Sequence, residues 1–134
     1  MAINLQKGQK IDIGLSNITV GLGWDPNEGT GHDFDLDASA IMINSERKLL
    51  SDNHFVFYNN LCGLGHDNPN QCKNNNCSPG EFGLLHTGDD PDGKSSDGDD
   101  DEAIEIDLSK VPQEVQEILF VVTIAEFEAR RQNF

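Results

Sequence analysis

The sequence lacks any long apolar run, and no stretch approaches the roughly 20 residues that a membrane-spanning helix needs. Its first eight residues contain no basic segment followed by an apolar one, so no secretion signal is indicated. Basic residues are scarce, with 9 Lys and Arg against 24 Asp and Glu among 134 residues. This surplus of negative charge repels phosphates and argues against nucleic acid as a partner. We expect a cytoplasmic chain without a transmembrane segment.

Cysteine is also scarce, and it occurs only at Cys62, Cys72 and Cys77. An odd number confined to one short region is a poor disulfide framework and agrees with a reducing compartment. Together with His66, the three thiols make a set of four soft ligands of the kind that zinc accepts. No Cys-x-x-Cys pair is present, so ordinary reduced thiols on a loop are the favoured interpretation.

Motifs of the common catalytic classes are missing. The sequence has no G-x-S-x-G, no glycine-rich phosphate loop ending in Lys-Ser or Lys-Thr, and no H-E-x-x-H. Its four histidines are scattered. His32 beside Asp33 is a candidate base, although a hydrogen bond at a loop edge is its favoured role. We therefore expect that the chain is not an enzyme.

Short apolar segments separated by Gly, Pro, Asn and Asp are abundant. Strands are indicated at residues 18–24, 34–43, 55–58, 81–86 and 104–108, and a buried strand at 118–124. Residues 111–116, with Ser109 as a candidate cap and Pro112 in the first turn, predict one short helix. Residues 62–80 form an irregular insert without periodicity. With no β–α alternation, we expect an all-β fold, a β-sandwich, in a single domain over residues 1–134.

Acidic residues are concentrated in two stretches. Residues 25–37 carry five carboxylates and no base, and residues 89–107 carry ten carboxylates and one base, Lys94. These stretches account for −14 of the net charge of −15. The bland interpretation, a solvated negative loop, suits residues 97–102 well. It suits the first stretch poorly, because apolar residues alternate with its acidic ones and tie it to a packed strand.

In an extended strand, Asp33, Asp35 and Asp37 share one face, because successive side chains point to opposite sides. Three carboxylates this close repel one another, and a bound divalent cation relieves the repulsion. An oxygen-only donor set favours Ca²⁺ over Zn²⁺, and its density favours Ca²⁺ over Mg²⁺. The spacing does not fit an EF-hand. We expect loops at one end of the sandwich to build the site, with Asp25 as a further contributor.

Seven blocks, in order along nearly the whole chain, resemble the TerD family of tellurium-resistance and bacterial stress-response proteins. The blocks are VGLGWD (20–25), DFDLDAS (33–39), FVFYNNL (55–61), HTGD (86–89), DDE (100–102), IDLSKVP (106–112), and FVVTI with ARRQNF (120–124 and 129–134). The resemblance implies a cytoplasmic, calcium-binding β-sandwich linked to resistance to tellurite and other stresses. It also implies other stress-response proteins as partners, and it leaves peripheral association with a membrane open.

The resemblance also implies which residues bind calcium. Carried over by motif, the ligands are Asp25, Asp33, Asp35 and Asp89, with Asp100, Asp101 and Glu102 closing the site; Asp37 joins them from the shared strand face. The chain departs from the family in two ways. The insert 62–80 is longer than the family's usual connection, and the strands that follow the last motif in the family, the C-terminal part of the domain, are absent here.

Two function classes stay open. In the first, the chain is a calcium-binding sensor or scaffold in a stress-response complex. In the second, it is an enzyme that uses the metal to polarise a phosphoryl or carbonyl substrate. The scattered histidines and the missing nucleophile favour the first.

Overall fold

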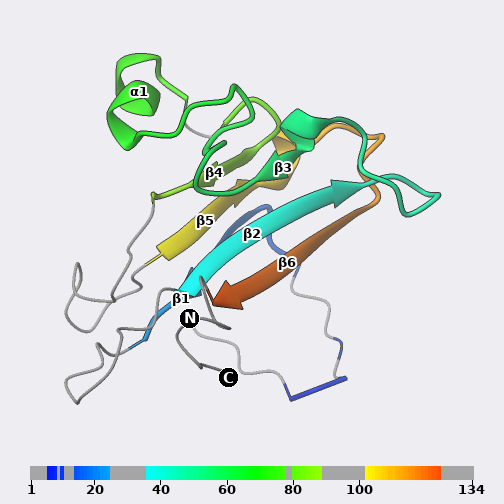
Figure 1. The fold of residues 1–134 in the computed structure, drawn as a ribbon. Helices are drawn as coiled ribbons and strands as arrows, with labels where there is room; N and C mark the ends of the chain where they lie inside the picture. The colour runs from blue at the N-terminus through cyan, green and yellow to red at the C-terminus, as the bar shows by residue number, and fades with distance from the viewer. Residues whose placement is uncertain are drawn as a thin grey trace.

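The computed structural model of the protein describes residues 6–8, 10, 14–24, 36–77, 80–88 and 102–124. Within them, six strands form two three-stranded antiparallel sheets with the orders β1-β5-β4 and β3-β2-β6 (Figure 1). The strands are β1 (Asn17–Leu22), β2 (Leu36–Ile43), β3 (Phe55–Val56), β4 (Leu84–His86), β5 (Glu102–Asp107) and β6 (Glu117–Ile124). No helix in the described residues is long and apolar enough to cross a membrane.

The two sheets share one hydrophobic core. Strand β2 supplies Ala38, Ala40 and Met42, because every second side chain of a strand points to the same face. The other strands add buried partners, namely Val56, Leu84, Ile104 and Ile106. The all-β class predicted from the sequence is confirmed. The β-sandwich arrangement stays a prediction, because the described residues give three strands of each sheet and do not establish the complete sheets.

The helix predicted at residues 111–116 is wrong. The short α-helix of the described chain is α1 (Pro69–Asn74), which lies in the insert (Figure 1). Near the predicted position the chain forms a 3₁₀ turn, η2 (Leu108–Lys110). Asp107, not Ser109, caps this turn, with its Oδ1 accepting the Ser109 N–H at 3.1 Å. The turn therefore begins earlier than predicted, and extended backbone at Val111 ends it.

Strand β6 is exposed rather than buried. It pairs with β2 at eight positions, from Leu36↔Ile124 to Ile43↔Glu117, and forms an edge of its sheet as described. Its apolar residues 119–122 remain 36–40% exposed. An apolar run has the same composition in a central strand and in an edge strand, so its sequence does not determine burial.

Candidate metal centres

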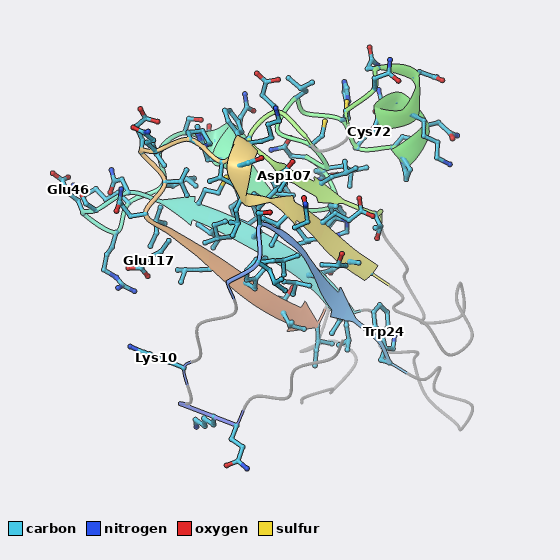
Figure 2. All side chains as sticks on the ribbon, turned by 180° about the vertical axis from the view of Figure 1, so that it is seen from behind. Lys10, Trp24, Glu46, Cys72, Asp107 and Glu117 are labelled. Carbon is cyan, nitrogen blue, oxygen red and sulfur yellow. The ribbon has the colours of Figure 1, made fainter. Side chains whose placement is uncertain are left out.

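Both acidic stretches are flanked by residues at the same end of the two sheets, which we call the acidic end (Figure 1). Strand β1 ends at Leu22, which lies opposite Glu102, the first residue of β5. Strand β4 ends at His86, close to the start of β5. In the other sheet, β2 begins at Leu36, opposite Ile124 at the end of β6. Residues 25–35 and 89–101 therefore connect strands that end and begin at this position. In Figure 2, Trp24 marks this end and Glu46 the opposite one.

Glu102 joins the two sheets at the acidic end. Its side chain is fully buried, and its Oε1 accepts the backbone N–H of Ala38 in β2 at 3.2 Å. His86 completes the arrangement, because its Nε2 lies 3.1 Å from the carbonyl oxygen of Ala38 and 3.2 Å from Glu102 Oε1. Residues from β2, β4 and β5 thus meet within hydrogen-bonding distance.

The early end of β3 explains why Ala38 needs these partners. Strand β3 pairs with β2 only at Ala40 and Ile41. In an antiparallel ladder, the N–H and C=O of one residue point to the same side. The N–H and C=O of Ala38 point away from β6, toward the side of β2 on which β3 has already ended. Glu102 supplies the acceptor and His86 the donor that a third strand would otherwise provide, and they so satisfy two buried backbone groups.

His86 is a neutral partner in this arrangement. Its Nδ1 accepts the backbone N–H of Gly88 at 2.9 Å, so its proton is on Nε2. Both acidic stretches adjoin this end and concentrate carboxylates there. Carboxylate oxygens are the ligands that hard cations prefer, so the acidic end is a candidate place for a cation.

Two of the eight residues predicted as calcium ligands lie in the described part of the chain. Glu102 is fully buried, and Asp37 is 9% exposed near the start of β2. Asp37 and Ala38 are successive residues of β2, and Ala38 belongs to the core, so strand geometry directs Asp37 to the opposite face. The other six predicted ligands lie outside the described residues, namely Asp25, Asp33, Asp35, Asp89, Asp100 and Asp101. The candidate base His32 also lies outside them.

Sequence reasoning did not assign His86 to this end. The signal available was alternation, because Leu84 and His86 are both buried in β4 while Leu85 between them is only half-buried. A histidine in phase with a buried leucine is typical of a satisfied polar group in a core. Its partners belong to strands far away in the sequence, and local pattern does not identify them.

The insert 62–80 is attached to the sheets through its two ends. The Glu81 N–H donates to the Cys62 carbonyl and the His86 N–H to the Leu61 carbonyl, each at 2.8 Å. Asn60 organises the turn that follows β3, with its Oδ1 accepting the N–H groups of Gly63 and Gly65 at 3.1 and 2.8 Å. The entry and exit of the insert consequently lie side by side.

Four soft side chains of the insert converge on one point. The Sγ atoms of Cys62, Cys72 and Cys77 lie 3.3, 3.7 and 3.5 Å from Nδ1 of His66. All four of these atoms lie within 4.8 Å of one another. The three cysteines are buried and His66 is half-buried. Cys72 is the buried residue of α1, and Figure 2 labels it beside this helix. The sequence favoured ordinary loop residues at these four positions. The fold instead brings the three cysteines and His66 together.

The insert has little else to hold it together. Apart from its cysteines and prolines, Leu64 is its one aliphatic side chain, and Leu64 is half exposed. Its small core contains the three thiols against Leu61 and Leu85, which flank the insert. Fixing one residue's backbone costs about 1–2 kcal/mol, so ordering 19 residues needs much more than three buried thiols supply.

Burial changes the acid strength of these thiols. Burial, together with hydrogen bonding and charge interactions with Cys62 and Cys77, raises the pKa of Cys72 to about 12. Burial also raises the pKa of Cys77. Without a cation, Cys72 and Cys77 are consequently protonated at neutral pH.

The family model for the TerD domain matches residues 1–134, which is the whole chain. The chain belongs to the TerD domain family. Among its relatives, it is 44% identical to the uncharacterized protein YceE and 42% identical to general stress protein 16U, both of Bacillus subtilis. It is 40% identical to the tellurium resistance protein TerD of Serratia marcescens. These matches cover 100% of this chain but only 63–64% of each relative. The TerD-family resemblance of the sequence blocks is thereby confirmed, and the chain is part of a tellurium-resistance and stress-response family.

Proposed function

We propose that this chain is a calcium-binding stress-response protein, which acts as a sensor or scaffold in the cytoplasm and not as an enzyme. The observation that carries the proposal is the buried Glu102 carboxylate, which contacts Ala38 and His86 at the end where both acidic stretches meet the sheets. Calcium prefers carboxylate and other oxygen ligands, and the two acidic stretches bring many carboxylates to this end. The proposed ligands are Asp25, Asp33, Asp35, Asp37, Asp89, Asp100, Asp101 and Glu102.

The role as a sensor or scaffold follows from how such a site would be built. Its ligands come from connections of both sheets, so a bound cation would join β2 to β5 in addition to the contacts of Glu102. Calcium would also reduce the strong negative charge of this end. Both changes alter the surface that a partner meets. The relatives named general stress protein and tellurium resistance protein support a role in stress response, with other stress-response proteins as partners.

The histidines that the structure describes support a binding role over catalysis. His54 contacts Ser51 Oγ at 2.6 Å and stacks on Phe82 with the ring centroids 4.0 Å apart. His86 is occupied at both ring nitrogens. His66 faces three thiols. Each of these imidazoles has partners within the fold, which agrees with a binding role.

Thermal unfolding with and without calcium tests the proposal. A ligand that binds only the folded state adds about 2.7 kcal/mol at 100 times its dissociation constant. For a domain of this size, we expect Tm to rise by about 10 °C. Calcium should be added to protein prepared in metal-free buffer, because common chelators also remove other metals. Magnesium at the same concentration is the control and should give a much smaller shift. Equal curves with and without calcium would contradict the proposal.

A further inference from the structure

The geometry of the insert matches a tetrahedral metal site. For Zn–S bonds of about 2.3 Å and a Zn–N bond of about 2.0–2.1 Å, tetrahedral angles put each sulfur about 3.6 Å from the nitrogen. The three Sγ–Nδ1 distances are 3.3, 3.5 and 3.7 Å. We propose that Cys62, His66, Cys72 and Cys77 bind one Zn²⁺ ion, which holds the insert in its folded form. This site is separate from the proposed calcium site and uses none of its residues.

Hydrogen bonding alone does not explain the convergence of the four side chains. A neutral imidazole nitrogen offers one lone pair and so accepts one thiol proton at a time. Nδ1 of His66 nevertheless lies within 3.7 Å of three sulfurs. A disulfide between two of the cysteines would leave the third and the imidazole without a reason to approach. A metal ion at the centre uses all four groups at once.

The donor set selects the metal. Three thiolates and one imidazole suit Zn²⁺, whose closed structural sites include Cys₃His. Calcium and magnesium prefer oxygen ligands, and an iron–sulfur cluster commonly uses four cysteines. Binding converts three thiols to thiolates, releases their three protons and leaves the site with a net charge of −1. Nothing is oxidised or reduced in this step.

Local backbone structure brings the ligands together. Asn68 caps α1 by accepting the Asn70 N–H at 2.9 Å, which fixes the helix that carries Cys72. After the helix, Asn76 adopts a left-handed conformation with φ of 52°. This turn reverses the chain, so that the Cys77 N–H donates to the Cys72 carbonyl at 3.0 Å. At the other side, the Leu61 N–H donates to the His66 carbonyl at 2.8 Å and closes the loop between the first two ligands.

Metal analysis of the intact protein tests this inference. The full chain should be purified without a metal-affinity step, equilibrated with Zn²⁺ and passed through a desalting column. Its metal content is then measured by inductively coupled plasma mass spectrometry. We expect one zinc per chain. Replacement of zinc by Co²⁺ should give a thiolate-to-cobalt charge-transfer band and the visible bands of tetrahedral cobalt.

Single-residue variants identify the ligands. Cys72→Ser and His66→Gln should each lower zinc affinity by more than about 100-fold, since changes to the groups around metal ligands alone cost 10–100-fold. His54→Gln is the matched control and should still bind one zinc. His66→Cys keeps a soft ligand and should retain zinc even if His66→Gln unfolds the insert. Wild-type protein that binds no zinc and gives no tetrahedral cobalt spectrum would overturn the inference, as would zinc binding that survives both ligand substitutions.

Discussion

At the residue scale, the Glu102 carboxylate can accept a backbone hydrogen bond and also serve as the proposed calcium ligand. One oxygen accepts the Ala38 N–H and lies close to His86 Nε2, which satisfies backbone groups left by the short strand β3. A carboxylate has two oxygens and about four lone-pair directions, so such bonds do not prevent it from binding a cation. Fixing the side chain in this way also prearranges it, which lowers the entropy that a ligand loses when the metal binds.

Substitution of Glu102 separates its charge from its shape. Glu102→Gln retains an oxygen that can accept the Ala38 N–H but removes the buried negative charge. We expect calcium affinity to fall by at least about 10-fold, because affinity in carboxylate sites depends on the number of charged ligands. The calcium-free protein should be as stable as wild type or more so, since burying a carboxylate charge is costly. Calorimetric titration and urea unfolding measure the two effects.

Glu105→Gln is the control for this change. Glu105 lies three residues further along β5 and is exposed, so its substitution removes the same charge from the same strand. Calcium affinity should then change little. If both substitutions weaken binding equally, the effect is diffuse electrostatics, and Glu102 is not a ligand.

At the same scale, sequence reasoning identified Asp37 and Glu102 as members of an acidic site and missed His86. Asp37 carries a local signal, since acidic and apolar residues alternate around it. Glu102 was assigned by its place in a family motif. The role of His86 depends on Ala38, 48 residues away, and on Glu102. No spacing rule connects residues that meet only through sheet packing.

At the element scale, alternation and short apolar runs located the six strands of the described residues but not their place in the sheets. The long apolar strand β6 was expected in the interior and lies at an edge, because position in a sheet depends on pairing with distant residues. The insert was misjudged for a different reason. It has no periodicity, and its order depends on the capped helix α1 and on four side chains that converge in space.

Replacing the insert tests whether it acts independently of the acidic end. Exchanging residues 63–79 for a short Gly/Ser turn keeps both attachment points, because the Glu81 N–H donates to the Cys62 carbonyl across the junction. The insert holds one carboxylate, Asp67, which is exposed. We expect calcium affinity to stay within a few-fold of wild type, while zinc binding is lost. Titration with each metal measures both results.

A loss of calcium binding in this variant, with the fold retained, would instead show that the insert supports the acidic end. The structure shows where such support could act. Pro69 of α1 packs against Gly88, where an added Cβ would lie 2.8 Å from the proline Cγ. Gly88 directly precedes the second acidic stretch. A point variant, Pro69→Ala, would then reproduce part of the loss.

At the scale of the whole molecule, the two metal centres proposed for this all-β chain differ in their chemistry. The proposed calcium site uses oxygen ligands around the acidic end, and the proposed zinc site uses sulfur and nitrogen ligands within the insert. Hard and soft donor sets discriminate between these ions by chemistry, so each metal can be bound in the presence of the other. Of the two, calcium binding is the central claim. It gives a reason for the two acidic stretches, which carry −14 of the net charge of −15.

Calorimetric titration of calcium into the zinc-loaded full chain tests that claim most directly. Loading with zinc first separates the two proposals, because the insert is then already saturated. We predict at least one calcium ion per chain with a dissociation constant below about 1 mM, the weakest range of protein calcium sites, and weaker binding of magnesium. Heats no larger than those of dilution, from protein that unfolds cooperatively, would contradict the account.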